Sequence, residues 1–554
     1  MIKKPVFIIF NFMSNMKSLL YKRLAFVLFF AGIFSCEVER LPETSISDQT
    51  FWRSETDLIA ATNYLYTFIP GFNNEDVWSD DAIGLASNQI SDGSRLAPST
   101  DANYSEPYRL IRAANNIIEK APLASSNVAA ATLDRYIADA RFFRAWGYFS
   151  LVQKFGDVPL ILKILSDESP ELLEAASPRE KIYDQIYQDL DFAISKLPTM
   201  ATLGAANYGK ISRTAAQAFK ARVALFEGTR SKFHGYGDPL KHLNLAVEAS
   251  KAVIDGKQHS LYANYFDLFQ MAGEGFANKE NIIVKPYGVS LADRVLTHTY
   301  FRSTLENGNK NPTKSLVDSY LMTDGLPITK SPLYKTPVVS TDVFTNRDER
   351  LSHSVFKKGD PYIFTKKVFD ISPLVFQKTG FCFRKFSNID DWNNQASFID
   401  RPILRYAEVL LMYAEAKFEL TNSITDADLD ISINLLRARG KIAKLTNALV
   451  TNNNLSMRDE IRRERRVELA QEGHRYWDII RWKIAEIELP KPVLGNYFFK
   501  SEFGTATTVN LTPDNFILVT PASFRKFNPA KDYLWPMPLN EISLNPNLKQ
   551  NPGW

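Results

Sequence analysis

Apolar residues recur with helical spacing in nine stretches of the 554-residue chain, and this pattern constrains its fold more than any other feature. The stretches are residues 55–68, 106–120, 133–155, 179–197, 213–227, 240–254, 403–420, 429–440 and 456–485. Between residues 256 and 401, and again after residue 488, the chain changes to short runs broken by Gly, Pro, Asn and Asp. The sequence therefore predicts a mainly α-helical protein with a large irregular insertion of loops and short strands.

The predicted helices are expected to form antiparallel pairs. Ala193, five residues before Pro198, is placed as in the second helix of a tetratricopeptide repeat, and Gly256 closes the pair formed by residues 213–227 and 240–254. Residues 403–420 are apolar nearly all round, which indicates a helix buried between neighbours. We expect tetratricopeptide-like pairs to form a scaffold, with the insertion packed on it, because about 145 residues are too many for one connection.

This pattern divides the chain into consecutive segments. We expect a signal peptide at residues 1–35, a lipidated tether at 36–50, an N-terminal helical region at 51–257 and a C-terminal region at 258–554. The C-terminal region comprises the insertion at 258–400, helices at 401–485 and an irregular segment at 486–554. The mature protein is expected to be one compact unit.

The N-terminal apolar run, residues 24–34, is too short to cross a membrane, which takes about 20 apolar residues. Basic residues precede it and a small residue follows, as in a secretory signal peptide. The sequence Ile33-Phe34-Ser35-Cys36 resembles a bacterial lipobox, in which the cysteine is acylated and becomes the new N-terminus. We therefore predict lipid attachment at Cys36, with a plain signal peptide as the alternative. Translation starts at either Met1 or Met16.

Removing the signal changes what the charge implies. The whole chain has 66 basic and 62 acidic residues, and residues 1–36 carry five of the basic residues and none of the acidic ones. The mature chain is therefore nearly neutral, and its charge gives no indication of a nucleic-acid partner. Cys382 is the remaining cysteine, so no disulfide forms within the mature chain.

One stretch, "MRDEIRRERRVELAQEGHRYWDIIRWK", carries a run of arginines that resembles a nucleic-acid-binding helix. Acidic residues alternate with these arginines, and Asp459 and Arg463 have the spacing of an ion pair on a helix. The sequence therefore favours an internal ion-pair network, and we predict no nucleic-acid binding.

The sequence carries no recognisable catalytic or metal motif. "GAANYGKIS" approaches a phosphate-binding loop, but Ile211 stands where a Ser or Thr must hold Mg²⁺, so we predict a turn with Ser212 as the N-cap of the next helix. The six histidines are scattered, and Cys382 is flanked by aromatic residues like a buried thiol. Paired acids such as Asp80-Asp81 are predicted to be solvated loop or cap residues, with calcium ligation as the alternative. We predict no cofactor and no metal.

Four segments resemble the SusD/RagB family of nutrient-binding outer-membrane lipoproteins. They are "ARFFRAWGYFSLVQKFGDVPLI", "RPILRYAEVLLMYAEAKFE", "IRRERRVELAQEGHRYWDIIRW" and "YLWPMPLNEISLNPNLKQNPGW". They occur in the family's order, and the match runs from about residue 41 to residue 554. The resemblance implies a SusD-like helical scaffold, a ligand-binding side built largely by the insertion, and a lipid anchor on the outer face of the outer membrane.

The resemblance also implies a function and a partner. The expected function is to bind an oligomeric nutrient, a glycan or alternatively a peptide, and to deliver it to a SusC-type TonB-dependent transporter without cutting it. The alternatives are a surface glycan hydrolase and a structural subunit of the import complex without a ligand of its own. The specificity for a particular nutrient would depend on the insertion, where the resemblance weakens.

Aromatic residues on loops are the candidates for the ligand site, because a ring exposed on a loop can stack on a sugar or a peptide side chain. Nearby amide, carboxylate and guanidinium groups would bind hydroxyls or backbone. The candidate residues are Trp78, Asn73, Asp80, Asp81, Tyr300, Arg302 and Trp392. The alternative is that each ring packs against its own loop.

Overall fold

The computed structural model describes residues 51–554, except 289–297, 363–367, 390–396 and 505–506. The chain divides into two compact units, Met1–Arg53 and Ser54–Trp554. The helices and strands named below belong to the second unit. The predicted signal peptide at 1–35, the tether at 36–50 and Cys36 lie outside the described residues, so they stay predictions.

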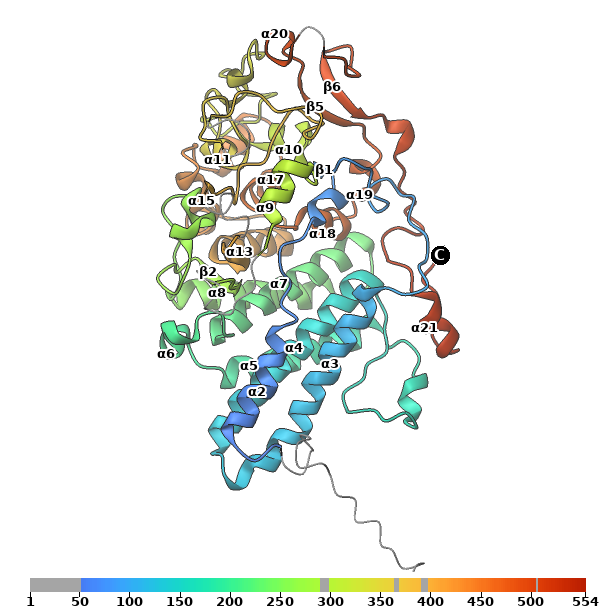
Figure 1. Ribbon diagram of the computed structural model, residues 1–554. Helices are drawn as coiled ribbons and strands as arrows, with labels where there is room; N and C mark the ends of the chain where they lie inside the picture. The colour runs from blue at the N-terminus through green and yellow to red at the C-terminus, as the bar shows by residue number, and fades with distance from the viewer. Residues whose placement is uncertain (1–50, 289–297, 363–367, 390–396, 505–506) are drawn as a thin grey trace, which may run out of the picture. The chain divides into compact units, whose positions relative to one another are not determined.

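Helices dominate the N-terminal half of this unit, as the periodicity predicts (Figure 1). They are α2 (Glu55–Tyr66), α3 (Ala102–Lys120), α4 (Ala130–Phe155), α5 (Arg179–Lys196), α6 (Met200–Leu203), α7 (Arg213–His234) and α8 (Pro239–Asp255). Each long helix packs on its neighbours in sequence: α3 on α4, α4 on α5, α5 on α7, and α7 on α8. This arrangement confirms the predicted scaffold of helix pairs.

Local sequence sets where these helices begin. Ser54 caps α2 in a reciprocal arrangement with Asp57, and Asp238 caps α8 directly before Pro239 at its first position. Ser212 accepts a hydrogen bond from the backbone N–H of Ala215 and caps α7. The loop "GAANYGKIS" is therefore a turn and a cap, as predicted.

Gly147 lets α4 approach α3 closely. A Cβ atom at this position would lie 2.8 Å from Cγ1 of Ile111 and 3.1 Å from the carbonyl oxygen of Pro107. Both distances are shorter than normal contacts, so the glycine is required by packing rather than by backbone conformation.

We expect Gly147→Ala to lower the free energy of unfolding by about 1–3 kcal/mol, because the added methyl group overpacks the contact between α3 and α4. Chemical denaturation of the purified protein would measure this change. Within a helix, Ala normally stabilises relative to Gly by about 0.5–1 kcal/mol. A stabilised variant would therefore contradict the close contact.

The insertion at residues 258–400 has short helices and strands rather than long ones. Its helices are α9 (Tyr300–Asn307), α10 (Lys314–Ser319) and α11 (Glu349–Ser354), and its strands are β2 (Asn281–Lys285) and β3 (Asn311–Pro312). β3 pairs antiparallel with β1 (Ala82–Ile83), and β2 pairs antiparallel with β4 (Arg401–Arg405). The insertion is therefore joined through short sheets to segments on both of its sides.

The 3-10 helices among the described residues are short connecting turns. They are η1 (Glu75–Trp78), η2 (Ala121–Ser126), η3 (Pro170–Leu173), η4 (Ala205–Asn207), η5 (Asp267–Phe269), η6 (Met271–Gly273), η8 (Ser340–Phe344) and η9 (Ala522–Phe524). Of these, η1 matters most for the candidate site, because its first residue, Glu75, lies there.

The C-terminal part begins with β4 and continues with a second group of helices. These are α13 (Tyr406–Thr421), α14 (Asp426–Asp430), α15 (Ile433–Arg439), α16 (Asn447–Asn452), α17 (Met457–Glu468), α18 (Arg475–Arg481), α19 (Ala485–Glu488), α20 (Lys500–Phe503) and α21 (Leu539–Leu544). The strands β5 (Val493–Tyr497) and β6 (Phe516–Thr520) form an antiparallel hairpin after α19. As predicted, α13 is buried on nearly all sides, and it contacts α7, α8 and α17.

Several predicted helices differ from those in the structure. The helix expected over residues 429–440 is divided between α14 and α15, because Ser432, with φ −135° and ψ −99°, is not helical. The helix expected from residue 403 begins at Tyr406, because the residues before it pair with β2 as strand β4. The continuous helix expected over residues 456–485 is broken between α17 and α18, where Gln471 and Gly473 have φ angles of 66° and 82°. Backbone in this left-handed region cannot continue an α-helix.

The arginines of α17 form ion pairs, as predicted, and most of their partners lie on other elements. Arg458 pairs with Glu419 of α13 at 2.7 Å, and Arg465 pairs with Asp478 of α18 at 2.9 Å. Arg462 differs, because its guanidinium lies 4.5 Å from the ring centre of Trp482. Burial lowers the pKa of Arg462 to about 10. This helix is therefore bound into the protein interior by its charges.

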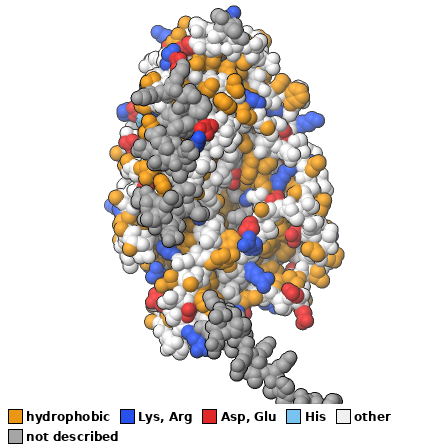
Figure 2. All heavy atoms as spheres, in the orientation of Figure 1, with side chains coloured by type: hydrophobic (Ala, Val, Ile, Leu, Met, Phe, Trp, Pro, Cys, Tyr) orange, Lys and Arg blue, Asp and Glu red, His pale blue; other side chains and the backbone are white. Residues whose placement is uncertain are grey.

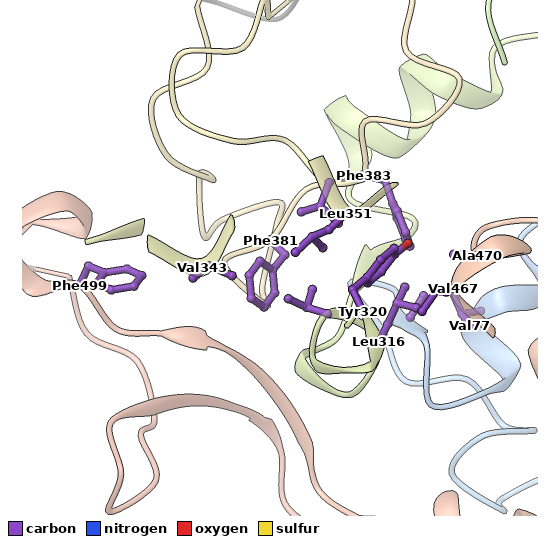
Figure 3. Close-up of a cluster of buried hydrophobic side chains, with 13 residues drawn as sticks. Val77, Leu316, Tyr320, Val343, Leu351, Phe381, Phe383, Val467, Ala470 and Phe499 are labelled. Carbon is purple, nitrogen blue, oxygen red and sulfur yellow. The ribbon is translucent and has the colours of Figure 1, made fainter. Parts of the chain in front are cut away.

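A hydrophobic cluster joins the insertion to both helical regions (Figure 3). Leu316, Tyr320 and Phe383 of the insertion pack with Val77 of η1 and Val467 of α17. These side chains are all buried. The cluster confirms that the insertion is a substructure packed on the helices, and it also fixes η1 in place.

On the face shown in Figure 2, acidic and basic side chains of the described residues are interspersed with hydrophobic ones. Within the described parts of the chain, no helix has the length and apolar composition needed to span a bilayer.

Candidate ligand-binding cavity

A cavity of about 180 Å³ lies where helices from both halves of the chain meet. Helices α4 and α7 line it on the N-terminal side, and β4 and α18 line it on the C-terminal side. Pro70 and Asn73, between α2 and η1, and Glu75 of η1 also line it. The cavity thus combines elements that are distant in the sequence.

Two partly exposed tryptophans supply aromatic faces to the cavity. Trp146 of α4 stacks on Phe219 of α7, with ring centres 4.8 Å apart and planes inclined by 8°. Trp477 of α18 stacks on Trp535, with ring centres 6.1 Å apart and planes inclined by 28°. A ring that is fixed by a second ring loses little conformational freedom when a ligand stacks on it.

Polar groups adjoin Trp477. The carboxylate of Glu75 accepts hydrogen bonds from the Asn73 side-chain amide at 2.8 Å and from the Trp477 indole N–H at 3.4 Å. The ammonium group of Lys154 lies 5.3 Å from the ring centre of Trp477 and 5.8 Å from that of Trp535. Burial lowers the pKa of Lys154, and the carboxylate of Glu75 opposes this effect.

Ion pairs hold the charged wall of the cavity rigid. Nε of Arg222 donates to Glu408 at 2.9 Å, and Nη2 of Arg481 donates to Glu415 at 2.8 Å. Burial raises the pKa of Glu408, but the Arg222 guanidinium outweighs burial and holds the pKa at about 2. Burial lowers the pKa of His474 to about 4 even beside Glu408, so this imidazole is neutral at pH 7.

The structure places one of the predicted site residues on the cavity surface and a second one behind it. Asn73 lines it. Trp78 is not on its surface but contacts Trp477 and Trp535 edge to face, with ring centres 6.3 Å and 5.4 Å apart. Trp78 therefore packs against residues distant in sequence rather than against its own loop.

Asp80 and Asp81 are buried rather than solvated, which corrects the expectation for these paired acids. Asp80 pairs with Arg475 at 2.8 Å and with Arg466 at 2.9 Å, and Asp81 pairs with Arg466 at 2.6 Å. Either carboxylate would have to leave an arginine to bind a ligand hydroxyl. These ion pairs tie the segment that follows η1 to α17 and α18.

Tyr300 and Arg302 lie on α9, outside the residues that line the cavity. The ring of Tyr300 stacks on Phe72 at 4.7 Å between centres, and its hydroxyl bonds to the ammonium of Lys310. Arg302 pairs with Glu306 at 2.8 Å. Trp392 lies outside the described residues. A ligand role for these three residues therefore stays a prediction.

Sequence reasoning missed Trp146, Trp477 and Lys154. All three lie on helices, where an aromatic or long side chain usually packs in the core or lies along the surface. The spacing of these residues within each helix does not indicate that the two helices and a loop at least 70 residues away line one cavity.

Among the described residues, no group of three or more His, Cys, Asp and Glu side chains is placed to hold a metal ion. The expectation that the protein needs no metal or cofactor stays a prediction.

Two protein-family models match separate parts of the chain. Residues 303–554 match the SusD family. Residues 52–225 match a family described as starch-binding and associating with the outer membrane. Together these matches include both sides of the cavity.

Similar proteins extend over nearly the whole chain. The SusD-like protein P2 of Formosa agariphila is 24% identical over 567 residues, which cover 96% of this chain and 99% of the relative. A SusD-like protein of Bacteroides ovatus is 25% identical over 592 residues, which cover 97% and 98%.

Solved structures show the same fold. A SusD-like carbohydrate binding protein from Bacteroides fragilis has a TM-score of 0.74 at 26% identity, and the match covers 90% of this chain and 100% of that one. A SusD homolog from Bacteroides thetaiotaomicron has a TM-score of 0.68 at 20% identity, with 92% and 98% covered. The expected SusD-like architecture is therefore confirmed.

Proposed function

This chain belongs to the SusD/RagB family. We therefore propose that it binds an oligomeric nutrient at the cell surface and delivers it to an outer-membrane transporter. We propose that this nutrient is a glycan. The observation that carries it is a cavity that joins fixed tryptophan faces to hydrogen-bonding groups. Such a combination of apolar walls and a few convergent polar groups is typical of small-molecule sites.

The similar proteins support a carbohydrate as the ligand. The family that matches residues 52–225 is described as starch-binding, and the similar Bacteroides fragilis structure is described as carbohydrate binding. The cavity suits one or two sugar rings, since sites for larger ligands usually have about 300–1,000 Å³. The rest of an oligomer would extend out of it along the surface.

We propose that binding depends on stacking and hydrogen bonds, without chemistry. Trp146 and Trp477 would stack on the apolar faces of sugar rings, and Asn73 would bind hydroxyls. Glycosidases need one carboxyl group with a raised pKa to donate a proton. The cavity carboxylates of Glu472 and Asp478 instead have pKa values lowered by arginines that overcome the effect of burial. This electrostatic arrangement favours binding over hydrolysis.

Delivery requires a membrane location and a partner. We propose that acylated Cys36 anchors the protein in the outer membrane facing the exterior, and that a SusC-type TonB-dependent barrel receives the ligand. The description of the matched family as associating with the outer membrane supports this location.

We expect Trp477→Ala to weaken oligosaccharide binding about ten- to hundredfold, since stacking on one aromatic ring is worth about 1–3 kcal/mol. Calorimetric titration of the full-length protein in detergent with a panel of neutral and charged oligosaccharides would identify the tightest ligand and then compare the variants.

Phe524→Ala is the matched control, because this ring is 70% exposed on η9 and does not line the cavity. It should keep the affinity of the native protein. A Trp477→Ala variant that folds and binds the same ligand with unchanged affinity would place the site elsewhere. Hydrolysis of the ligand by the purified protein would support the hydrolase alternative.

A further inference from the structure

The positive and negative side chains that line the cavity do not all pair with one another. Its carboxylates are Glu75, Glu472 and Asp478. Glu472 pairs with Lys385 at 2.7 Å, and Asp478 pairs with Arg465 at 2.9 Å. The oxygens of Glu75 accept N–H donors from a side-chain amide and an indole, as described above. All three carboxylates are therefore already engaged by the protein.

Two cations of the lining have no such partner. Among the described residues, no carboxylate oxygen lies within 4.0 Å of the Lys154 ammonium, which instead faces Trp477 and Trp535. Arg401 donates to the backbone carbonyl oxygens of Pro70 and Gly71 and has no carboxylate partner in the described chain. Both side chains remain partly accessible from the cavity.

A third donor is left unused. Arg465 lines the cavity and is 5% exposed, and its Nε is bound by both oxygens of Asp478. Its Nη1 is buried and has no hydrogen-bond partner among the described residues. A buried guanidinium nitrogen without a partner is costly, and it leaves part of the positive charge of Arg465 unmatched in the cavity wall.

From this imbalance we infer that the cavity selects a glycan bearing an anionic group, a uronic acid carboxylate or a sulfate ester, which binds Lys154 and Arg401 while its sugar ring stacks on Trp477. This inference rests on the proposed function and names the ligand class of the same site. The protein contributes charge attraction in a partly enclosed cavity, where salt screens it less than at an open surface. Neutral sugars would leave both cations unpaired.

Calorimetric titration with three probes of equal length tests the inference: an oligogalacturonate, a sulfated galactan oligosaccharide and a malto-oligosaccharide. We expect at least one anionic probe to bind the full-length protein at least tenfold more tightly than the neutral probe. Comparison of the two anionic probes shows whether carboxylate or sulfate is the preferred group.

Lys154→Gln should lower the ratio of anionic to neutral affinity about tenfold. Lys181→Gln, on the exposed side of α5, is the matched control and should keep the native ratio. Should Lys154→Gln fail to fold, Arg401→Gln serves the same purpose and should shift the ratio in the same direction.

The outcomes separate the inference from the proposed function. A neutral probe that binds as tightly as both anionic ones, or a ratio unchanged in Lys154→Gln, overturns the inference and leaves the proposed function standing. Failure of both anionic probes to bind also overturns the inference. In these titrations, the proposed function itself fails if no member of the wider oligosaccharide panel binds.

Discussion

Replacing Glu468 by glutamine is expected to lower the free energy of unfolding by about 3–5 kcal/mol, the cost of breaking a buried ion pair by removing one partner. The carboxylate of Glu468 is fully buried and contacts Arg350 at 2.8 Å and both Arg405 and Arg439 at 2.6 Å. Glutamine keeps the shape but removes the negative charge. Three guanidinium groups would then share the remaining carboxylates in the protein interior.

The same contacts predict how the effect depends on pH. Burial raises the pKa of Glu468, but Arg439, Arg405 and Arg350 outweigh burial and lower the pKa to about 2. In the unfolded chain the pKa of a glutamate is about 4.3. A lowered pKa in the folded state gives stability that is present above the unfolded value and is lost as pH falls towards the folded value. The difference between native protein and Glu468→Gln should therefore shrink between about pH 4.3 and pH 2.

Chemical denaturation at pH 7 and at several lower pH values would measure both effects. Glu106→Gln is the matched control, because Glu106 pairs with Arg109 on the exposed side of α3. Exposed ion pairs contribute little to stability, so this variant should unfold like the native protein. A Glu468→Gln variant that unfolds like the control would contradict the structural role of the network.

Replacing Cys36 by alanine is expected to move the protein from the membrane fraction to the soluble fraction. The acyl chains on a lipobox cysteine would supply the membrane affinity, at about 0.8 kcal/mol per buried CH₂ group. Alanine removes the thiol that carries them. Cells grown with labelled palmitate and lacking the SusC-type barrel would be fractionated, so that a partner cannot hold the protein at the membrane.

Cys382→Ala is the control for this experiment, because it removes the other cysteine of the chain. Cys382 is a buried thiol in a hydrophobic cluster of the insertion, and burial raises its pKa well above the usual value. This variant should stay labelled and membrane-bound. A Cys36→Ala protein that remains labelled and membrane-bound would show that residue 36 is not the anchor.

The helical scaffold could be predicted from sequence because each long helix carries its own signal. Helix α5 begins at Arg179 as the periodicity indicates, and Ser212 marks the start of α7. Strand β4 could not be predicted in this way. Its partner β2 lies more than 100 residues earlier in the chain. An apolar run before a helix looks the same in the sequence whether or not it pairs with such a distant strand.

The ion pairs were predictable in kind but not in detail. Alternating charges on α17 indicate pairing, yet Glu464 and Glu468 bind arginines from α11, α15 and β4. Such partners meet only in the folded protein, because α11 belongs to the insertion and β4 and α15 are separate elements of the C-terminal part. A single sequence indicates that these charged residues form ion pairs, but it does not identify their partners.

The candidate site shows the same limit more strongly. Asn73 was predicted because it lies in a polar loop with aromatic residues, and the structure places it at the cavity. Trp146 and Trp477 were missed because a ring on a helix usually packs in the core. What sets them apart is that they line one cavity together with Pro70, Asn73 and Glu75, and this cavity exists only in the folded protein.

A crystal structure of the full-length protein with its tightest-binding oligosaccharide would test the proposed binding site directly. The proposed function predicts an intact sugar chain whose terminal ring stacks on Trp477, with Asn73 within hydrogen-bond distance of it. An oligosaccharide bound away from the cavity would contradict the assigned site, and a cleaved one would contradict a function limited to binding.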